Sequence, residues 1–209
     1  MKRRFLLVLA LSLVLSCLSL PALAEVPQPN GDFYVLDLSG VLSDETKGNI
    51  ILNNDLLFGA CQGQIVVVTV DSTGDTDIGD YACDLFNSWG IGSAEKNNGM
   101  LILLAIQDDD YYVLQGMGLE EALPSGTLAS LNNAYLEPYF AQKDYDTGVW
   151  ALFSQIYTRV AAHSGLSMTA DDTLYSQYLS AIQARPSRGV PPLLILAPLA
   201  VIFLLYLIL

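Results

Sequence analysis

Five aspartates stand where the predicted strands of this chain end. In chain order they are Asp37 after a short strand at 33–36, Asp71 after the apolar run 64–70, and Asp108, Asp109 and Asp110 after the run 100–106. In an open sheet of parallel strands, ligands gather at the carboxyl ends of the strands. Carboxylate oxygens are the ligands that hard cations prefer. These residues are therefore the predicted metal ligands, and the expected cofactor is a divalent cation, Ca²⁺ or Mg²⁺.

Aspartate is also common in turns, because its side chain hydrogen-bonds the nearby backbone. For residues 108–110 the turn and metal interpretations stay equally open. For residues 71–77, a loop that runs into a helix cap is the stronger interpretation. An EF-hand is excluded, since Ala82 stands at the twelfth position of a loop beginning at Asp71, where a glutamate is required.

A second set of residues is predicted near the opposite edge of the sheet. Its members are Asn97, Asn98, Gly99, Gly116, Gly118 and Glu120. Glycine at such positions permits a positive φ or a close approach of two backbone segments. We interpret the set as structural, with Glu120 as the one further candidate for function.

The residue inventory excludes several kinds of catalytic site. His163 is the only histidine, so neither a Ser-His-Asp triad nor a histidine-rich zinc site can be assembled. No phosphate-binding glycine loop or dinucleotide motif is present. Arg159 is the only arginine between residues 25 and 184, so an arginine clamp for phosphate is nearly absent.

The charge distribution limits the kinds of partner that the chain can bind. All 22 acidic residues but only four of the nine basic ones fall within residues 25–184, which gives this part a net charge of −18. Such a surface repels nucleic acid, and it favours divalent cations or basic partners. A phosphatase would need metal ions to offset this charge.

The amino-terminal residues have the features of an export signal. Three basic residues at 2–4 precede an apolar run, and small residues lead to a predicted cleavage site after Ala24. A lipoprotein signal cut before Cys17 is the less favoured alternative, because Leu15 fits the required motif poorly.

The carboxyl-terminal stretch 190–209 carries no charged residue. As a helix its 20 residues would span about 30 Å, the thickness of a hydrocarbon core. It shows no polar face, so a transmembrane helix is favoured over a buried one. The chain is thus expected in the cell membrane as a single-pass protein, with residues 25–184 outside the cytoplasm. Arg185 and Arg188 on the outer flank run against the positive-inside bias.

The region between these ends alternates strands with helices, which indicates one α/β domain with a mostly parallel sheet between helix layers. Strands are predicted at 33–36, 64–70, 100–106 and 111–115, and helices after a Ser43 cap and at 77–89, 126–136, 147–162 and 171–184. Ile50, Ile51, Leu52, Leu56 and Leu57 are the expected apolar stripe of the first helix, and Trp89 is expected in the core. Cys61 and Cys83 form a disulfide or stay unpaired, and both alternatives are open.

Several short motifs in this region resemble the TPM domain family. They are Val35-x-Asp37-x-x-Gly40-Val41-Leu42-Ser43, the strand at 65–70, Tyr81-Ala82, Trp89-Gly90-Ile91-Gly92, Asn97-Asn98-Gly99-Met100-Leu101, Gly116-Met117-Gly118-Leu119-Glu120, Pro138-Tyr139-Phe140 and Asp144-Tyr145-x-x-Gly148. The resemblance implies a three-layer α/β/α sandwich and divalent-cation binding, and a phosphatase activity has been proposed for the family. Where many members have an aspartate after the Gly-x-Gly-Leu-Glu run, this chain has Ser125.

These observations together predict a domain plan and a function. The plan is a signal peptide at 1–24, a linker at 25–32, the TPM domain at 33–165, a linker with a short helix at 166–189, and a transmembrane helix at 190–209. The expected function is an accessory or quality-control module for envelope proteins that is tethered to the membrane and binds a divalent cation. The alternative is a metal-dependent phosphatase that acts on small phosphoesters. The expected partners are the membrane and envelope or membrane proteins.

Overall fold

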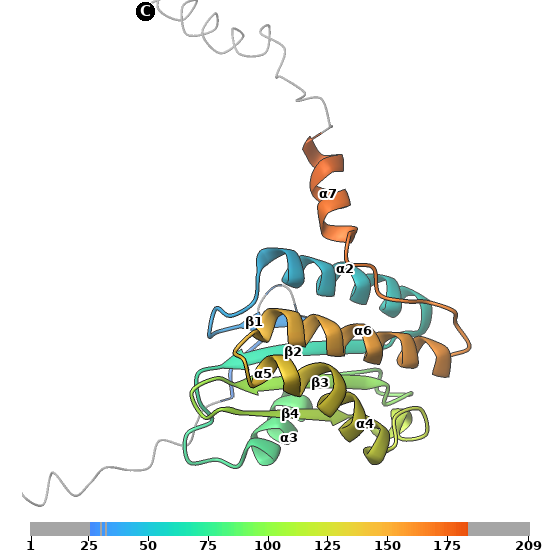
Figure 1. Cartoon of the computed structure of the whole chain (residues 1–209). Coiled ribbons are helices and arrows are strands. Elements are labelled where there is room, and N and C mark those ends of the chain that lie inside the picture. Colours follow the sequence, from blue (N-terminus) through green and yellow to red (C-terminus); the bar gives the residue numbers. More distant parts are fainter. Residues whose placement is uncertain (1–25, 30, 32, 184–209) are drawn as a thin grey trace, which may run out of the picture.

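The computed structural model describes residues 26–29, 31 and 33–183 (Figure 1). The predicted signal peptide at 1–24 and the predicted span at 190–209 lie outside this part of the chain. Within the described residues, none of the helices combines the length and the apolar character that crossing a bilayer requires.

The sheet has four strands in the order in which they follow one another along the chain. They are β1 (Val35–Asp37), β2 (Gln64–Val70), β3 (Gly99–Ala105) and β4 (Asp110–Gln115). The first three strands run parallel, and β4 pairs antiparallel with β3. The register aligns Asp37 with Thr69, so the carboxyl ends of β1 and β2 share one edge. The prediction of a mostly parallel sheet is confirmed, and the last two strands form an antiparallel hairpin.

Helices cover both faces of the sheet. One core contains Ile65 and Val67 of β2, packed against α2 (Asp44–Cys61) and α6 (Tyr145–His163). The short helices that lie between β4 and α6 along the chain also contribute to this core. The other core contains Val66 and Val68 packed against α3 (Ile78–Trp89). Since alternate residues of a strand point to opposite faces, the apolar run of β2 serves both cores. The described residues thus form three layers (Figure 1).

Local capping explains where α2 and α3 begin. The Ser43 side chain accepts a hydrogen bond from the Thr46 amide at 3.1 Å, as its position before Asp44 and Glu45 predicts. Asp77 caps α3 in the same way, by accepting from the Gly79 amide at 2.8 Å. The helix then ends at Gly90, whose φ of 62° favours glycine. The buried residues of α3 are Tyr81, Ala82, Leu85 and Trp89, so the expectation that Trp89 lies in the core is confirmed.

The predicted apolar stripe of α2 is wrong in part. Ile50 and Leu57 are fully buried, but Leu56 is 52% exposed. The buried face is instead completed by three asparagines, Asn49, Asn53 and Asn54. A polar side chain can be buried at low cost when each of its groups is hydrogen-bonded, and these three are.

The carboxyl-terminal half is more segmented than predicted. After η1 (Met117–Leu119), the region of the predicted helix 126–136 consists of α4 (Ser125–Leu131) and a π-helical turn η2 (Asn132–Leu136), and a separate short helix, α5 (Glu137–Phe140), follows. After α6 the chain returns to α2, and α7 (Leu174–Gln183) then projects away from the sheet (Figure 1).

Candidate functional site

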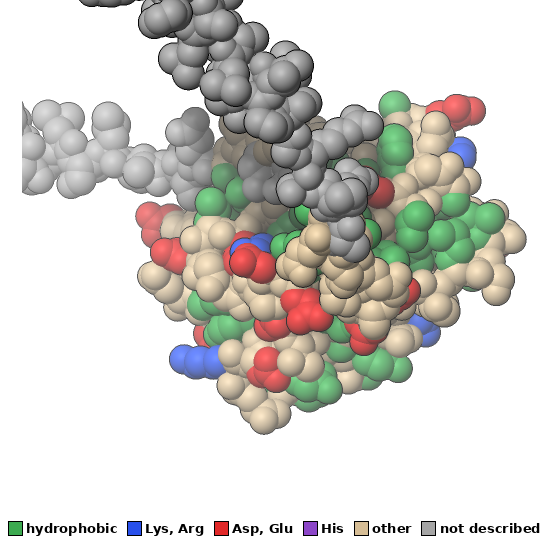
Figure 2. All heavy atoms as spheres, turned by 90° about the horizontal axis from the view of Figure 1, so that it is seen from above, with side chains coloured by type: hydrophobic (Ala, Val, Ile, Leu, Met, Phe, Trp, Pro, Cys, Tyr) green, Lys and Arg blue, Asp and Glu red, His purple; other side chains and the backbone are tan. Residues whose placement is uncertain are grey.

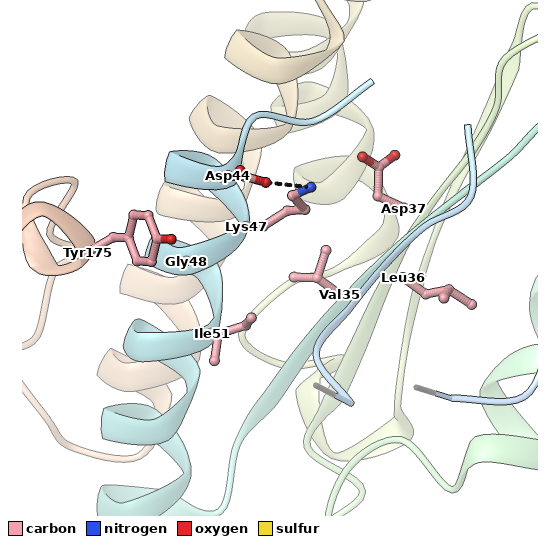
Figure 3. Close-up of a pocket in the computed structure, with 8 residues that line it drawn as sticks. All are labelled: Val35, Leu36, Asp37, Asp44, Lys47, Gly48, Ile51 and Tyr175. Atoms are coloured by element: carbon pink, nitrogen blue, oxygen red, sulfur yellow. Dashed lines mark ion pairs between the residues drawn. The ribbon is translucent and has the colours of Figure 1, made fainter. Parts of the chain in front are cut away.

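A polar pocket lies between β1 and α2, at the base of α7 (Figure 3). It has a volume of about 420 Å³ and is lined by Val35, Leu36, Asp37, Asp44, Lys47, Gly48, Ile51 and Tyr175. Asp37 comes from the carboxyl end of β1, where an open α/β sheet binds its ligands. This pocket is therefore the candidate site.

The Asp37 carboxylate is already engaged by three donors. Its Oδ1 accepts from the Val41 amide at 3.1 Å and from the Thr69 hydroxyl at 2.6 Å, and its Oδ2 accepts from the Leu42 amide at 3.0 Å. These bonds fix the loop that turns from β1 into α2, in which Gly40 has a φ of 64°. Asp37 is thus a structural centre of the edge, with few lone pairs left for a ligand.

Lys47 supplies the positive charge of the pocket. Its Nζ lies 3.0 Å from Asp44 Oδ1. This hydrogen bond raises the pKa of Lys47, and the negative charges of Asp44, Asp37 and Asp146 raise it further against the opposing effect of burial. Figure 3 shows Lys47 between Asp44 of α2 and Asp37 of β1. The pocket therefore contains one positively charged side chain, Lys47, which is surrounded by carboxylates.

The remaining predicted metal ligands act in turns. Asp108 Oδ2 accepts from the Thr73 amide at 2.8 Å, and hydrogen bonds from Ser72 and Thr73 lower the pKa of Asp108. It thereby joins the β3–β4 turn to the loop after β2. Asp109 has a φ of 53°, and Asp110 accepts from the amide of the residue that follows it. Asp71 is exposed.

The five aspartates share an edge of the sheet, but they do not form a coordination shell. Among the described residues, no group of three or more Asp, Glu, His or Cys side chains converges closely enough to hold a metal ion. Of these five, Asp37 and Asp108 accept the most hydrogen bonds, and the donors are backbone amides and hydroxyl groups. The arrangement does not fit a metal centre built from side chains alone.

The glycines of the opposite edge have the structural role that the sequence predicts. A Cβ at Gly116 would meet the Asn97 carbonyl, and one at Gly118 would meet the Lys96 carbonyl. A second pocket of about 420 Å³ lies here, between Ala60, Cys61, Lys96, Asn98, Gly118, His163 and Ser164. Lys96 Nζ donates to the Cys61 carbonyl at 3.0 Å, which caps the carboxyl end of α2. Glu120 is exposed and does not line this pocket.

Comparison with known proteins identifies the family. The family model of the TPM domain matches residues 35–159, which is more than half of the chain. The chain belongs to the TPM domain family. No curated protein is similar to it.

Solved structures share the fold of this TPM domain. The N-terminal domain of a protein from P. gingivalis is 24% identical with a TM-score of 0.58, covering 65% of this chain and 86% of that one. The N-terminal domain of the cg2496 protein from Corynebacterium glutamicum is 21% identical with a TM-score of 0.50, covering 67% and 87%. The BA42 protein from Bizionia argentinensis is 19% identical with a TM-score of 0.51, covering 60% and 86%.

The structure leaves both thiols of the TPM domain free, against the disulfide alternative. Cys61 is buried at the end of α2, where its Sγ donates to the Leu57 carbonyl. Cys83 is exposed on α3. Because α2 and α3 cover opposite faces of the sheet, the sheet separates the two sulfurs.

Sequence reasoning missed the asparagines that hold the base of α7. Asn49 donates to the Asp172 carbonyl at 2.6 Å and accepts from the Tyr175 amide at 2.8 Å. Asn53 donates to the Asp171 carbonyl and accepts from the Asp171 amide, each at 2.9 Å. The signal was present, because Asn49 and Asn53 are four residues apart and therefore share one face of a helix.

Proposed function

We propose that this TPM domain is an exported, membrane-tethered binding module that assists envelope proteins, rather than a hydrolase. The engagement of Asp37 carries the proposal. A carboxylate whose oxygens already accept three hydrogen bonds has few lone pairs free and is poorly placed to act as a nucleophile or general base. Export and tethering rest on the sequence features at residues 1–24 and 190–209.

The charges around the pocket argue against phosphoryl transfer. A transferring phosphoryl group needs several cations around it. Lys47 is the one basic residue among those that line the pocket, and it is paired with Asp44. Arg159 lies on α6, where its Nη1 donates to the Gln155 carbonyl at 3.1 Å. A metal-dependent phosphatase is therefore the less favoured function.

The acidic surface supports partners that carry positive charge. Acidic side chains are spread over the face seen in Figure 2, with few basic ones among them. Since the net charge of residues 25–184 is −18, long-range attraction would draw basic surfaces toward the domain. We infer that the partners are envelope proteins with basic surfaces.

We propose that a divalent cation binds through one or two carboxylates and keeps most of its bound water. Mg²⁺ commonly keeps several waters and uses one or two carboxylates, so a full shell of side chains is not required. Asp71, Asp109 and Asp110 are exposed and supply such carboxylates. Free ion at about 100 times its dissociation constant would stabilise the fold by about 2.7 kcal/mol. This stabilisation raises Tm, and the rise should exceed the one that monovalent salt produces at equal ionic strength. Equal rises would mean that general screening of the negative charge explains the effect.

A capture experiment and an activity assay together test the proposal. The tagged full chain is used to capture crosslinked envelope proteins from membranes. Asp44→Lys reverses a negative charge at the pocket and is expected to lose these basic partners, whereas Asp84→Lys, the same charge change on the exposed side of α3, is expected to retain them. Hydrolysis of a small phosphoester that disappears in Asp37→Asn would overturn the binding-module proposal and establish the phosphatase.

A further inference from the structure

Beyond its first turn, helix α7 presents an apolar face that no described residue covers. Tyr178, Leu179 and Ile182 are 50%, 39% and 43% exposed, and no residue of the helix is buried. With Tyr175 they follow the spacing i, i+3, i+4, i+7, which places them on one side of the helix. The opposite side carries Ser176, Gln177, Ser180 and Gln183.

The base of this helix is fixed to the domain. The buried side chains of Asn49 and Asn53 bind the backbone of residues 171–175, as described above. The Tyr175 ring lies against Gly48, where an added Cβ would collide with it. Beyond this anchor the helix projects from the α2 side of the molecule (Figure 1). Its apolar face is thus held away from both cores.

Three observations identify the occupant of this face as lipid. None of the ten residues of α7 is charged, although the exported region has a net charge of −18. The uncharged stretch 190–209 begins only six residues after the helix, and the intervening residues include Arg185 and Arg188, which suit anionic headgroups. Two of the four residues of the apolar face are tyrosines, which are enriched at the boundary between water and hydrocarbon.

We propose that α7 lies in the interface of the bilayer that anchors the chain, with its apolar face toward the acyl chains. This inference rests on the proposed membrane tether. An interfacial amphipathic helix buries its apolar face by about 5–10 Å into the boundary between headgroups and acyl chains. A second copy of the chain fits less well. A ten-residue helix is about 15 Å long, and a stable interface needs more than about 1,000 Å².

The placement brings the candidate pocket to the membrane surface. Tyr175 both lines the pocket and begins the apolar face of α7. A helix fixed at the lipid interface therefore holds the pocket close to the headgroups. Partners that reach it would be membrane proteins or segments that lie near the bilayer.

Fluorescence quenching in vesicles tests the inference. The full chain is reconstituted into phosphatidylcholine and phosphatidylglycerol vesicles, with or without brominated acyl chains that quench tryptophan. Tyr178→Trp and Ile182→Trp place reporters on the apolar face, and Ser180→Trp is the matched control on the polar face. The wild-type chain gives the background of Trp89 and Trp150. Because only one face is buried, we expect quenching about twofold greater for the two apolar-face reporters than for the control.

The outcomes separate the tether from the helix. Vesicle flotation shows whether the chain is bound to the membrane. If the chain floats and all three reporters are quenched equally, or none above background, α7 does not lie in the interface and the inference fails while the tether stands. If the chain does not float with vesicles, the tether and the inference both fail.

Discussion

Replacing the buried Asn54 with alanine should destabilise the domain more than the same change at an exposed asparagine does. The side chain is fully buried in α2. Its Nδ2 donates to the Ile65 carbonyl at 2.9 Å, and its Oδ1 accepts from the Ile65 amide at 2.8 Å. Strand β1 pairs with β2 only from Val67 onward, so Asn54 takes the place of the missing strand at Ile65.

The size of the effect follows from the groups that would lose their partners. Asn54→Ala leaves the amide and carbonyl of Ile65, a residue with no exposed surface, without these hydrogen bonds. Each unsatisfied buried group costs about 1–3 kcal/mol, and the better helix propensity of alanine offsets less than about 1 kcal/mol. We expect a net loss of about 3 kcal/mol, which lowers Tm by roughly 6–12 °C for a domain of this size.

Urea unfolding of residues 26–183, followed by tryptophan fluorescence, measures this loss. Asn87→Ala is the matched control, because Asn87 is exposed on α3. The control should change stability by no more than about 0.5 kcal/mol. Equal losses in the two variants would show that Asn54 does not substitute for a strand at Ile65.

Three further changes have defined outcomes. Burial raises the pKa of Tyr111 to about 12, with help from its hydrogen bond to Glu137. Its stabilising effect is therefore complete below pH 10.0 and is lost as pH rises toward 12. In a titration of tyrosinate absorbance, Glu137→Gln should lower this pKa, and an unchanged pKa would exclude the bond. Hydrogen bonds lower the pKa of Asp108, so its contribution exists above pH 3.8 and disappears as pH falls through the folded pKa. Asp108→Asn should thus reduce the urea midpoint at neutral pH, and this reduction should shrink as pH falls below 3.8; a reduction that does not change with pH would refute this. Gly48→Ala should displace the Tyr175 ring and speed hydrogen exchange of the Tyr175 amide, and unchanged exchange would show that the ring is not held there.

The sequence predicted the elements whose signals are local. The run at 64–70 is nearly all apolar and β-branched, and it forms β2 as expected. The caps at Ser43 and Asp77 depend on residues only two or three positions away. Trp89 of α3 lies in the core as expected, on a buried face that it shares with Tyr81, Ala82 and Leu85.

The candidate site could not be predicted in the same way. That Asp37 ends a strand follows from the apolar pattern, but its bond to Thr69 depends on the pairing of β1 with β2. Tyr175 enters the pocket only because the chain returns to α2 after α6. Long-range contacts of this kind leave no periodic signal in one sequence.

The polar residues of α2 explain why apolar periodicity failed there. Asn54 binds β2, while Asn49 and Asn53 bind the segment that leads into α7. A leucine at any of these positions would bury more apolar surface, but it would leave backbone groups on the neighbouring segments unpaired. One helix thus connects the sheet to α7 through directional bonds. If α7 lies on the bilayer, this rigid connection determines how the pocket faces the membrane. An apolar contact alone would allow the helix to slide relative to the domain.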